Sequence, residues 1–204
     1  MISRILISLP ASALLLSGCT AGLTSPATSG QEASPTAFVS APGAATAERS
    51  AAQAEVRLHN PAGEVVGTAR LVEDAAGRVH LSVHVEGLAP GLHGMHLHAV
   101  GRCDGSTTPA FASAGGHFNP TGAEHGHHNP AGHHAGDLPN LVVNPAGVGR
   151  LSTTLEQFAI ADLFDADGTA LVIHQNEDDL RTNTGPLGPG NSGPRIACGV
   201  VSRR

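Results

Sequence analysis

Short runs in which apolar and polar residues alternate dominate the chain after about residue 53. In residues 78–86, Val79, Leu81, Val83 and Val85 share one face and polar residues share the other. Because successive side chains of a strand point to opposite faces of a sheet, this alternation predicts a strand with one buried and one solvated face. Seven further runs have the length and the β-branched content of strands, namely 54–59, 64–72, 95–100, 140–143, 149–155, 170–174 and 195–201.

Glycine and proline turns separate these runs. Asn60-Pro61-Ala62-Gly63, for example, lies between two apolar runs and predicts a hairpin connection. No segment keeps a sustained helical period, so eight short strands predict an all-β antiparallel sandwich or barrel. Two long gaps, residues 101–139 and 175–194, interrupt the pattern, and loops of that length in a compact domain usually carry function.

The first 52 residues differ from the rest and are not expected to join this fold. Arg4 precedes an apolar stretch, residues 5–16, which is shorter than the roughly 20 residues of a membrane-spanning helix and resembles an export signal. Leu16-Ser17-Gly18-Cys19 resembles a bacterial lipobox, which implies cleavage before Cys19 and its acylation; the alternative is an ordinary secretory signal cleaved elsewhere. Residues 20–52 are rich in Ala, Ser, Thr, Pro and Gly, a composition typical of a flexible tether.

We therefore expect three parts: a signal peptide over residues 1–18, a lipidated linker over residues 19–52, and a folded domain over residues 53–204. Both interpretations of the leader place the mature chain outside the cytoplasm, in the bacterial cell envelope, and the lipobox implies contact with a membrane. The residues do not indicate which leaflet would hold the anchor. With Cys19 assigned to lipid, Cys103 and Cys198 remain, and an oxidising compartment favours a disulfide between them over two free thiols.

Charge and composition narrow the function. The net charge is −6, all eleven basic residues are arginines, and none of them form a basic run, which argues against nucleic acid as a partner. Of 13 histidines, nine lie between His93 and His134, and histidine at that density usually indicates metal. His96 and His98 are two residues apart on a predicted strand, so both imidazoles project from the same face and can chelate one ion.

At this point the sequence resembles the copper/zinc superoxide dismutase family. The resemblance rests on four motifs in the family's order and covers about residues 54–201; the motifs are Gly91-Leu92-His93-Gly94-Met95-His96-Leu97-His98, Gly115-Gly116-His117-Phe118-Asn119-Pro120, His134-Ala135-Gly136-Asp137-Leu138 and Gly190-Asn191-Ser192-Gly193-Pro194-Arg195-Ile196-Ala197-Cys198-Gly199. It implies an eight-stranded Greek-key barrel that dismutates superoxide to oxygen and hydrogen peroxide.

The resemblance also implies a role for each motif residue. Copper would be bound by His96, His98, His117 and His174, and zinc by His117, His125, His134 and Asp137. Four imidazoles suit redox-active copper, and three imidazoles with a carboxylate suit a closed tetrahedral zinc site. Asp178 would accept hydrogen bonds from His96 and His125, Arg195 would attract and orient the superoxide anion, and Cys103 and Cys198 would form the family disulfide.

The sequence also contains other histidines, and it differs from the family pattern in residues 175–194. We expect His59, His80 and His84 to be solvated and His93 to support the fold. His127, His128 and His133 crowd the zinc loop, where one of them could compete with His134 for metal, but the His-x-Gly-Asp-Leu motif favours His134 over His133 as the ligand. Residues 175–194 carry one basic residue, Arg181, and Pro189 stands where the family has a threonine. These departures predict a somewhat slower enzyme with a shallow salt dependence.

Two other function classes stay open. The chain could be an exported copper- or zinc-binding protein without turnover, or a zinc hydrolase, although four protein ligands would close the zinc site that a hydrolase needs. The sequence leaves the choice between monomer and homodimer open, together with the conformation of residues 105–113.

Overall fold

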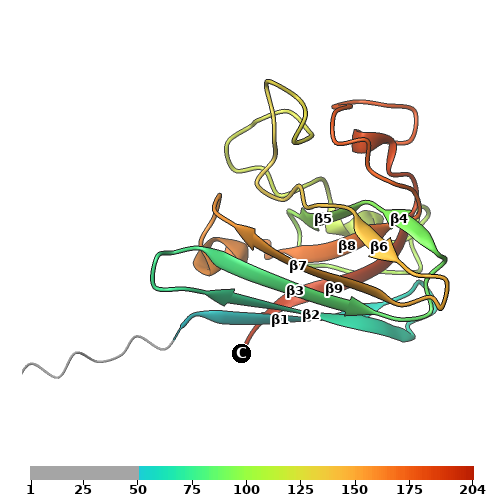
Figure 1. The fold of residues 1–204 in the computed structure, drawn as a ribbon, viewed down its shortest axis with the longest axis horizontal. Coiled ribbons are helices and arrows are strands. Elements are labelled where there is room, and N and C mark those ends of the chain that lie inside the picture. The colour runs from blue at the N-terminus through green and yellow to red at the C-terminus, as the bar shows by residue number, and fades with distance from the viewer. Residues whose placement is uncertain (1–50) are drawn as a thin grey trace, which may run out of the picture. The chain divides into compact units, whose positions relative to one another are not determined.

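The computed structural model describes residues 51–204 (Figure 1). The predicted signal peptide, Cys19 and the linker up to residue 50 lie outside the described residues. Within the described part, no helix has the length and apolarity needed to cross a membrane.

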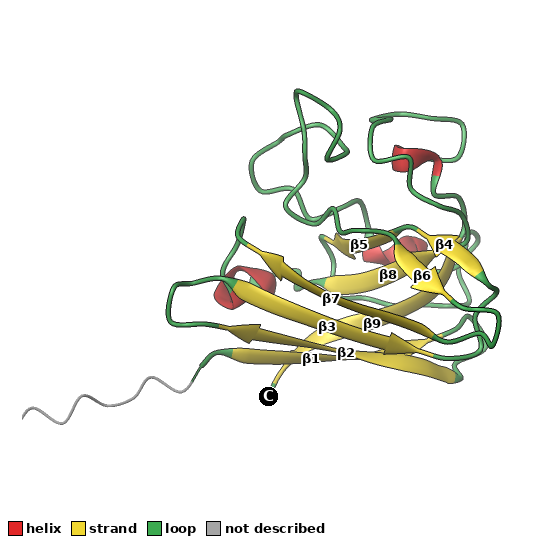
Figure 2. Ribbon diagram, in the orientation of Figure 1, coloured by secondary structure: helices red, strands yellow, loops and turns green. Residues whose placement is uncertain are grey.

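Nine strands and three short 3₁₀ helices make up the domain (Figure 2). The strands are β1 (Gln53–His59), β2 (Val65–Glu73), β3 (Val79–Val85), β4 (Gly91–His93), β5 (Met95–His98), β6 (Leu141–Val143), β7 (Gly149–Leu155), β8 (Ala170–His174) and β9 (Arg195–Arg203), and the helices are η1 (Ala112–Ala114), η2 (Ile160–Phe164) and η3 (Pro189–Asn191). All eight predicted strands are present, which confirms the all-β prediction. The expected count of eight is wrong by one, because Gly91–His93 forms a separate strand that is too short to show an alternation.

All ladders of the sheet are antiparallel, and its order is β4-β6-β7-β3-β2-β1-β9-β8-β5. The two edge strands, β4 and β5, are consecutive in the chain and joined by Gly94 alone. One residue cannot span an open nine-stranded sheet, so the sheet curls into a nearly closed barrel.

Gly94 meets the structural demands of this closure. Its N–H donates to the carbonyl of Asn176 at 2.7 Å, and its own carbonyl accepts from the N–H of His174 at 2.8 Å. A Cβ at this position would lie 2.7 Å from Oγ of Ser192, so a side chain does not fit beneath the loop that covers it. The glycine thus joins the barrel closure to the loop of residues 175–194.

Alternation along the strands builds the core. Val79, Leu81, Val83 and Val85 of β3 are at most 4% exposed and pack with equivalent residues of the other strands, while the alternating polar residues face outward. Burial of this apolar surface is the main favourable contribution to folding.

The two gaps in the strand pattern are long loops on one side of the barrel, seen above the strands in Figure 1. We call residues 101–139 the first long loop and residues 175–194 the second long loop. The predicted disulfide is present between Cys103 and Cys198, which have a sequence separation of 95 residues, and ties the first long loop to β9. A second apolar cluster surrounds it, formed by Phe111, Ala114, Ala170 and Val172.

Candidate metal centre

Four imidazoles from three parts of the chain meet at the base of the long loops. His96 and His98 come from β5, His174 from the end of β8, and His117 from the first long loop. One ligand nitrogen of each lies within 4.8 Å of those of the others. The β8–β9 register shifts between Ile173 and His174, a bulge of the kind that redirects a side chain at the end of a strand.

Three nitrogens of this group are buried without a hydrogen-bond partner. They are Nδ1 of His96, Nε2 of His98 and Nε2 of His174. Each second ring nitrogen is bonded: Nε2 of His96 to Asp178, Nδ1 of His98 to the carbonyl of Gly115, and Nδ1 of His174 to the carbonyl of Gly193. An unsatisfied buried polar atom costs about 1–3 kcal/mol. Three such atoms directed at one point therefore fit a copper ion.

A second group lies beside the first and centres on Asp137. Oδ1 of Asp137 lies 2.9 Å from Nδ1 of His117, 3.0 Å from Nδ1 of His125 and 3.2 Å from Nδ1 of His134. Nδ1 of His117 and Nδ1 of His134 are 3.3 Å apart. A tetrahedral zinc with bonds of about 2.0 Å holds its ligand atoms about 3.3 Å apart, so these four atoms fit one zinc ion.

His117 belongs to both groups. Its Nδ1 lies at Asp137, which leaves Nε2 for the first group, and its ring stacks on that of His96 at 3.9 Å between centroids. A single imidazole can therefore connect the two sets of ligands.

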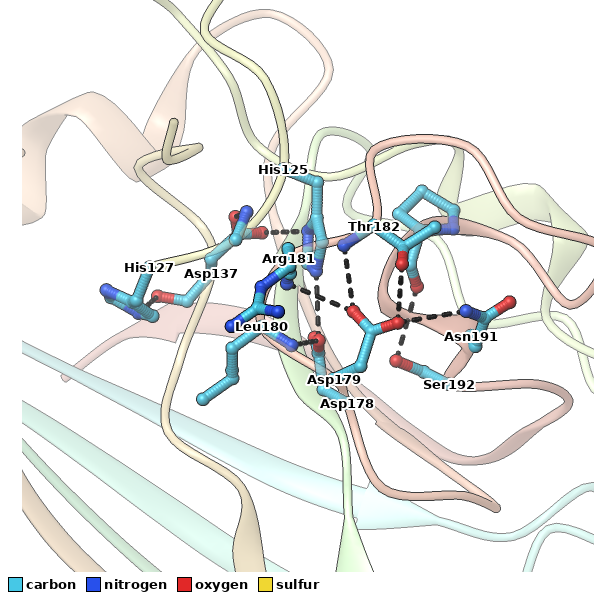
Figure 3. A network of polar contacts seen from close by, with 12 residues as sticks. His125, His127, Asp137, Asp178, Asp179, Leu180, Arg181, Thr182, Asn191 and Ser192 are labelled. Atoms are coloured by element: carbon cyan, nitrogen blue, oxygen red, sulfur yellow. Dashed lines mark hydrogen bonds and ion pairs between the residues drawn. The ribbon is translucent and has the colours of Figure 1, made fainter. Parts of the chain in front are cut away.

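Asp178 connects the two groups on the other side. Its Oδ1 accepts from Nε2 of His125 at 3.0 Å, a contact drawn in Figure 3. Its Oδ2 accepts from Nε2 of His96 at 2.5 Å. Asn140 fixes its backbone with two hydrogen bonds of 2.9 Å. Because the carboxylate holds Nε2 of each ring, Nδ1 is the nitrogen of each ring that is oriented for a metal.

Burial and the two carboxylates set the proton affinities of the metal-free site. Burial lowers the pKa of His96, His98 and His117, and lowers that of His174 to about 4, so these rings are neutral, the form that binds metal. Burial also acts to lower the pKa of His125, but hydrogen bonds to Asp137 and Asp178 outweigh it and raise that pKa to about 9.

The carboxylates respond in the opposite sense. Burial acts to raise the pKa of Asp137 and of Asp178, but hydrogen bonds from the imidazoles outweigh it, so both pKa values lie well below the usual range. Both groups are therefore carboxylates at any physiological pH, ready to balance the charge of a cation.

Arg195 lies at the mouth of the first group. A cavity of about 400 Å³ reaches three of its imidazoles, those of His98, His117 and His174, and is also lined by Arg195, Leu187 and Pro189. The guanidinium donates from Nη1 to the carbonyl of Phe111 and from Nη2 to the carbonyl of Gly115, both at 2.6 Å. Burial lowers the pKa of Arg195, but the group stays a cation because an arginine pKa is far above physiological pH.

Sequence reasoning missed these two carbonyls and left residues 105–113 open. Within this segment Phe111 lies directly before η1, is 2% exposed and adopts a left-handed conformation with φ 59°. That conformation directs its carbonyl toward Arg195. A backbone carbonyl leaves no mark in residue identity, so only the structure could find it.

His80, His84 and His93 lie where they were expected, whereas His59 is half-buried. His80 contacts Asp74 and Thr154, and His84 contacts Glu86, all on the outer surface. His93 is buried and bonds to the carbonyls of Ala89 and His174. His133 contacts Gln157, and its ring lies 3.7 Å from that of His127, whereas Nδ1 of His134 lies 3.2 Å from Oδ1 of Asp137.

The described residues thus form a Greek-key-type barrel with two adjoining sets of metal ligands that share one histidine, and the chain is a metal-binding β-barrel protein. The family model for copper/zinc superoxide dismutase matches residues 65–201. The chain belongs to this family.

Individual relatives agree with the family match. The chain is 41% identical over 155 residues to superoxide dismutase [Cu-Zn] 2 of Aquifex aeolicus, which covers 73% of this chain and 86% of the relative. It is 36% identical over 204 residues to the superoxide dismutase-like protein YojM of Bacillus subtilis, covering 97% and 95%. The solved structure of the Cu/Zn superoxide dismutase of Brucella abortus superposes with a TM-score of 0.60 at 32% identity, covering 74% of this chain and 99% of that one.

Proposed function

We propose that this protein dismutates superoxide to oxygen and hydrogen peroxide. Copper would be held by His96, His98, His117 and His174, and zinc by His117, His125, His134 and Asp137. When bound, copper supplies one-electron redox chemistry, whereas zinc has none and would stabilise the site. The observation that carries the proposal is the three partnerless nitrogens of His96, His98 and His174. Two of these histidines, His98 and His174, line a cavity together with a fixed arginine.

Arg195 is the proposed catalytic cation. Because two carbonyls fix its guanidinium, it needs no rearrangement to attract and orient a small anion in the cavity. His117 has a second role, since its Nε2 can hold and release a proton while its Nδ1 stays at Asp137. The rim residues Leu187 and Pro189 are uncharged, so substrate attraction depends mainly on Arg195.

The uncharged rim also supports a second candidate, a metal-binding protein of this family that does not turn over superoxide. A metal titration separates the two functions. Metal-free protein is loaded with copper, with zinc or with both, and superoxide turnover is measured at each ratio. Dismutation requires activity that depends on copper, saturates at one equivalent and is lost in His174→Ala; His84→Ala, whose ring lies on the outer surface, is the matched control. Tight copper binding without turnover would refute the dismutase.

We also propose that the chain is exported and anchored by acylated Cys19. The disulfide supports an oxidising compartment, because such bonds are rare in the reducing cytosol. Mass spectrometry of the mature N-terminal peptide tests the anchor. Acyl chains on Cys19 are expected, and an unmodified cysteine, or cleavage elsewhere, would refute it.

A further inference from the structure

The outer face of the barrel on β1, β2, β3 and β7 carries a row of basic side chains. Arg57 on β1 is opposite Thr68 on β2, Thr68 is opposite His84 on β3, and His84 is opposite Arg150 on β7. Arg70 lies in the neighbouring row, opposite Glu55 and Ser82. We call Arg57, Arg70, His84 and Arg150 the basic sheet face; all but the half-buried His84 are exposed.

These arginines are not neutralised within the fold. Among residues 51–204, the ion pair that involves an arginine is Arg78 with Asp74, and no carboxylate lies within 4.0 Å of the three arginines of the face. Arg70 instead donates to the side-chain amide of Gln53 at 2.8 Å. A shallow hollow of about 440 Å³ opens between them, lined by Arg57, Arg70 and His84 with one acid, Glu55.

The basic sheet face is positively charged, whereas the whole chain has a net charge of −6. Apart from Glu55 on β1 and Glu73 at the end of β2, the described acidic residues lie in turns and loops, such as Asp162, Asp165 and Asp167 around η2 and the run 177–179 of the second long loop. Arg70 has Glu55 opposite it, but Arg57 is opposite Thr68 and Arg150 is opposite His84, so the arginines of the face exceed its acids. An anion outside the protein would neutralise it.

We propose that the basic sheet face docks the domain on a membrane surface of anionic phospholipids. Guanidinium groups bind phosphate with several hydrogen bonds at once, and basic residues near an anionic bilayer are attracted individually. The face extends over four neighbouring strands, which suits an extended surface better than a small ligand held in a deep pocket. The proposal draws on the proposed lipid anchor, because β1 begins at Gln53, only 34 positions after Cys19, which would keep the domain at a membrane.

Docking in this way has a consequence for the metal centre. The two long loops lie on the other side of the barrel from β1 and β2 (Figure 1). With the basic sheet face against the headgroups, the cavity of Arg195 would open away from the lipid, toward the compartment from which superoxide arrives.

The test uses the metal-loaded domain of residues 51–204, which contains the whole core and the disulfide and corresponds to nearly all of the Brucella abortus chain, a protein of this domain alone. Without Cys19 it binds vesicles only through its own surface. Its sedimentation is measured with vesicles of phosphatidylcholine and with vesicles that also contain phosphatidylglycerol, at low and high salt. Binding is expected only to the anionic vesicles and should fall as salt screens the charges.

Charge variants assign the binding to this face. Each arginine removed should lower the vesicle partition coefficient about fivefold, so Arg57→Gln, Arg70→Gln and Arg150→Gln together should lower it about a hundredfold. The control combines Arg78→Gln, Arg102→Gln and Arg181→Gln, which change the net charge equally at other exposed positions and should leave most of the binding.

Three results would overturn the proposal. They are no binding of the unaltered domain to anionic vesicles, equal losses in the two triple variants, or retention on immobilised polyphosphate without vesicle binding, which would assign the face to a soluble polyanion. None of these readouts depends on superoxide turnover or on acylation, so they fail or succeed independently of the proposed enzyme and anchor.

Discussion

Replacing Asp178 with asparagine should weaken copper binding more than zinc binding. In the structure, Oδ1 of Asp178 accepts from Nε2 of His125 and from the N–H of Leu180, whereas Oδ2 accepts only from Nε2 of His96. An asparagine oxygen would therefore occupy the Oδ1 position, where two donors meet. Its NH₂ group would then face Nε2 of His96.

This arrangement places a donor against a donor at a site where both side chains are fully buried. His96 can relieve the conflict by moving its proton from Nε2 to Nδ1, but Nδ1 is then unable to bind a metal. A lost hydrogen bond to a charged group is worth about 1.5–3 kcal/mol, which corresponds to about a 10- to 100-fold loss of copper affinity. His125 keeps its acceptor, so zinc affinity should change less.

The assay is competition with a chromophoric chelator, first for copper and then for zinc, on the folded metal-free protein. Asp179→Asn is the matched control. It removes the same charge one residue away, from a carboxylate that bonds to Arg181, Thr182 and Asn191 and touches no proposed ligand. If the two variants bind copper equally well, or if zinc affinity falls more than copper affinity in Asp178→Asn, the tautomer argument is wrong.

Three further outcomes are expected. The Arg195→Gln variant should keep its metals but turn over superoxide at least about tenfold more slowly. Turnover by the unaltered protein should depend only weakly on ionic strength, and a steep salt dependence would contradict the reliance on one fixed cation. Replacing both Cys103 and Cys198 with serine should lower the unfolding free energy of the metal-free protein by about 4–5 kcal/mol in urea titrations, and an unchanged midpoint would count against it. Folding lowers the pKa values of His96, His98, His117 and His174, so below the histidine pKa of 6.5 the unfolded chain binds more protons than the folded protein does. The stability of the metal-free protein should therefore fall between pH 6.5 and 4, by up to about 1.4 kcal/mol per pH unit for each group. His125 has a raised pKa and titrates above this window, and a flat stability profile would refute the assignment.

The strands could be predicted from the sequence because each has a local signal. Residues 79–85 alternate so regularly that both the strand and its buried face follow from the pattern. β4 was missed because three residues cannot show a period, and Gly94 gave no sign that the chain crosses there from one sheet edge to the other. Strand order depends on pairings between distant segments, which local patterns do not report.

The site residues also fall into those that the sequence could predict and those that only the structure shows. The spacing of His96 and His98 indicates a shared face, but the other ligands were named from the resemblance to a family, since His117 and His125 lie in an irregular loop and His174 lies far away in the sequence at the end of β8. The roles of Phe111 and Gly115 depend on backbone carbonyls and could not be predicted from side-chain identity. Structure was needed to show which oxygen of Asp178 serves which ring.

The contacts of Asp178 also bear on how this family can diversify. One carboxylate of the second long loop holds a ring from β5 and a ring from the first long loop, and Gly190 leaves the space it needs, since a Cβ there would collide with it. A loop transplanted from a relative would bring its own spacing and misplace both rings at once. The two long loops are therefore expected to be exchangeable between homologues only as a matched pair, so that insertions in one are tolerated at its tip and not near its ligands.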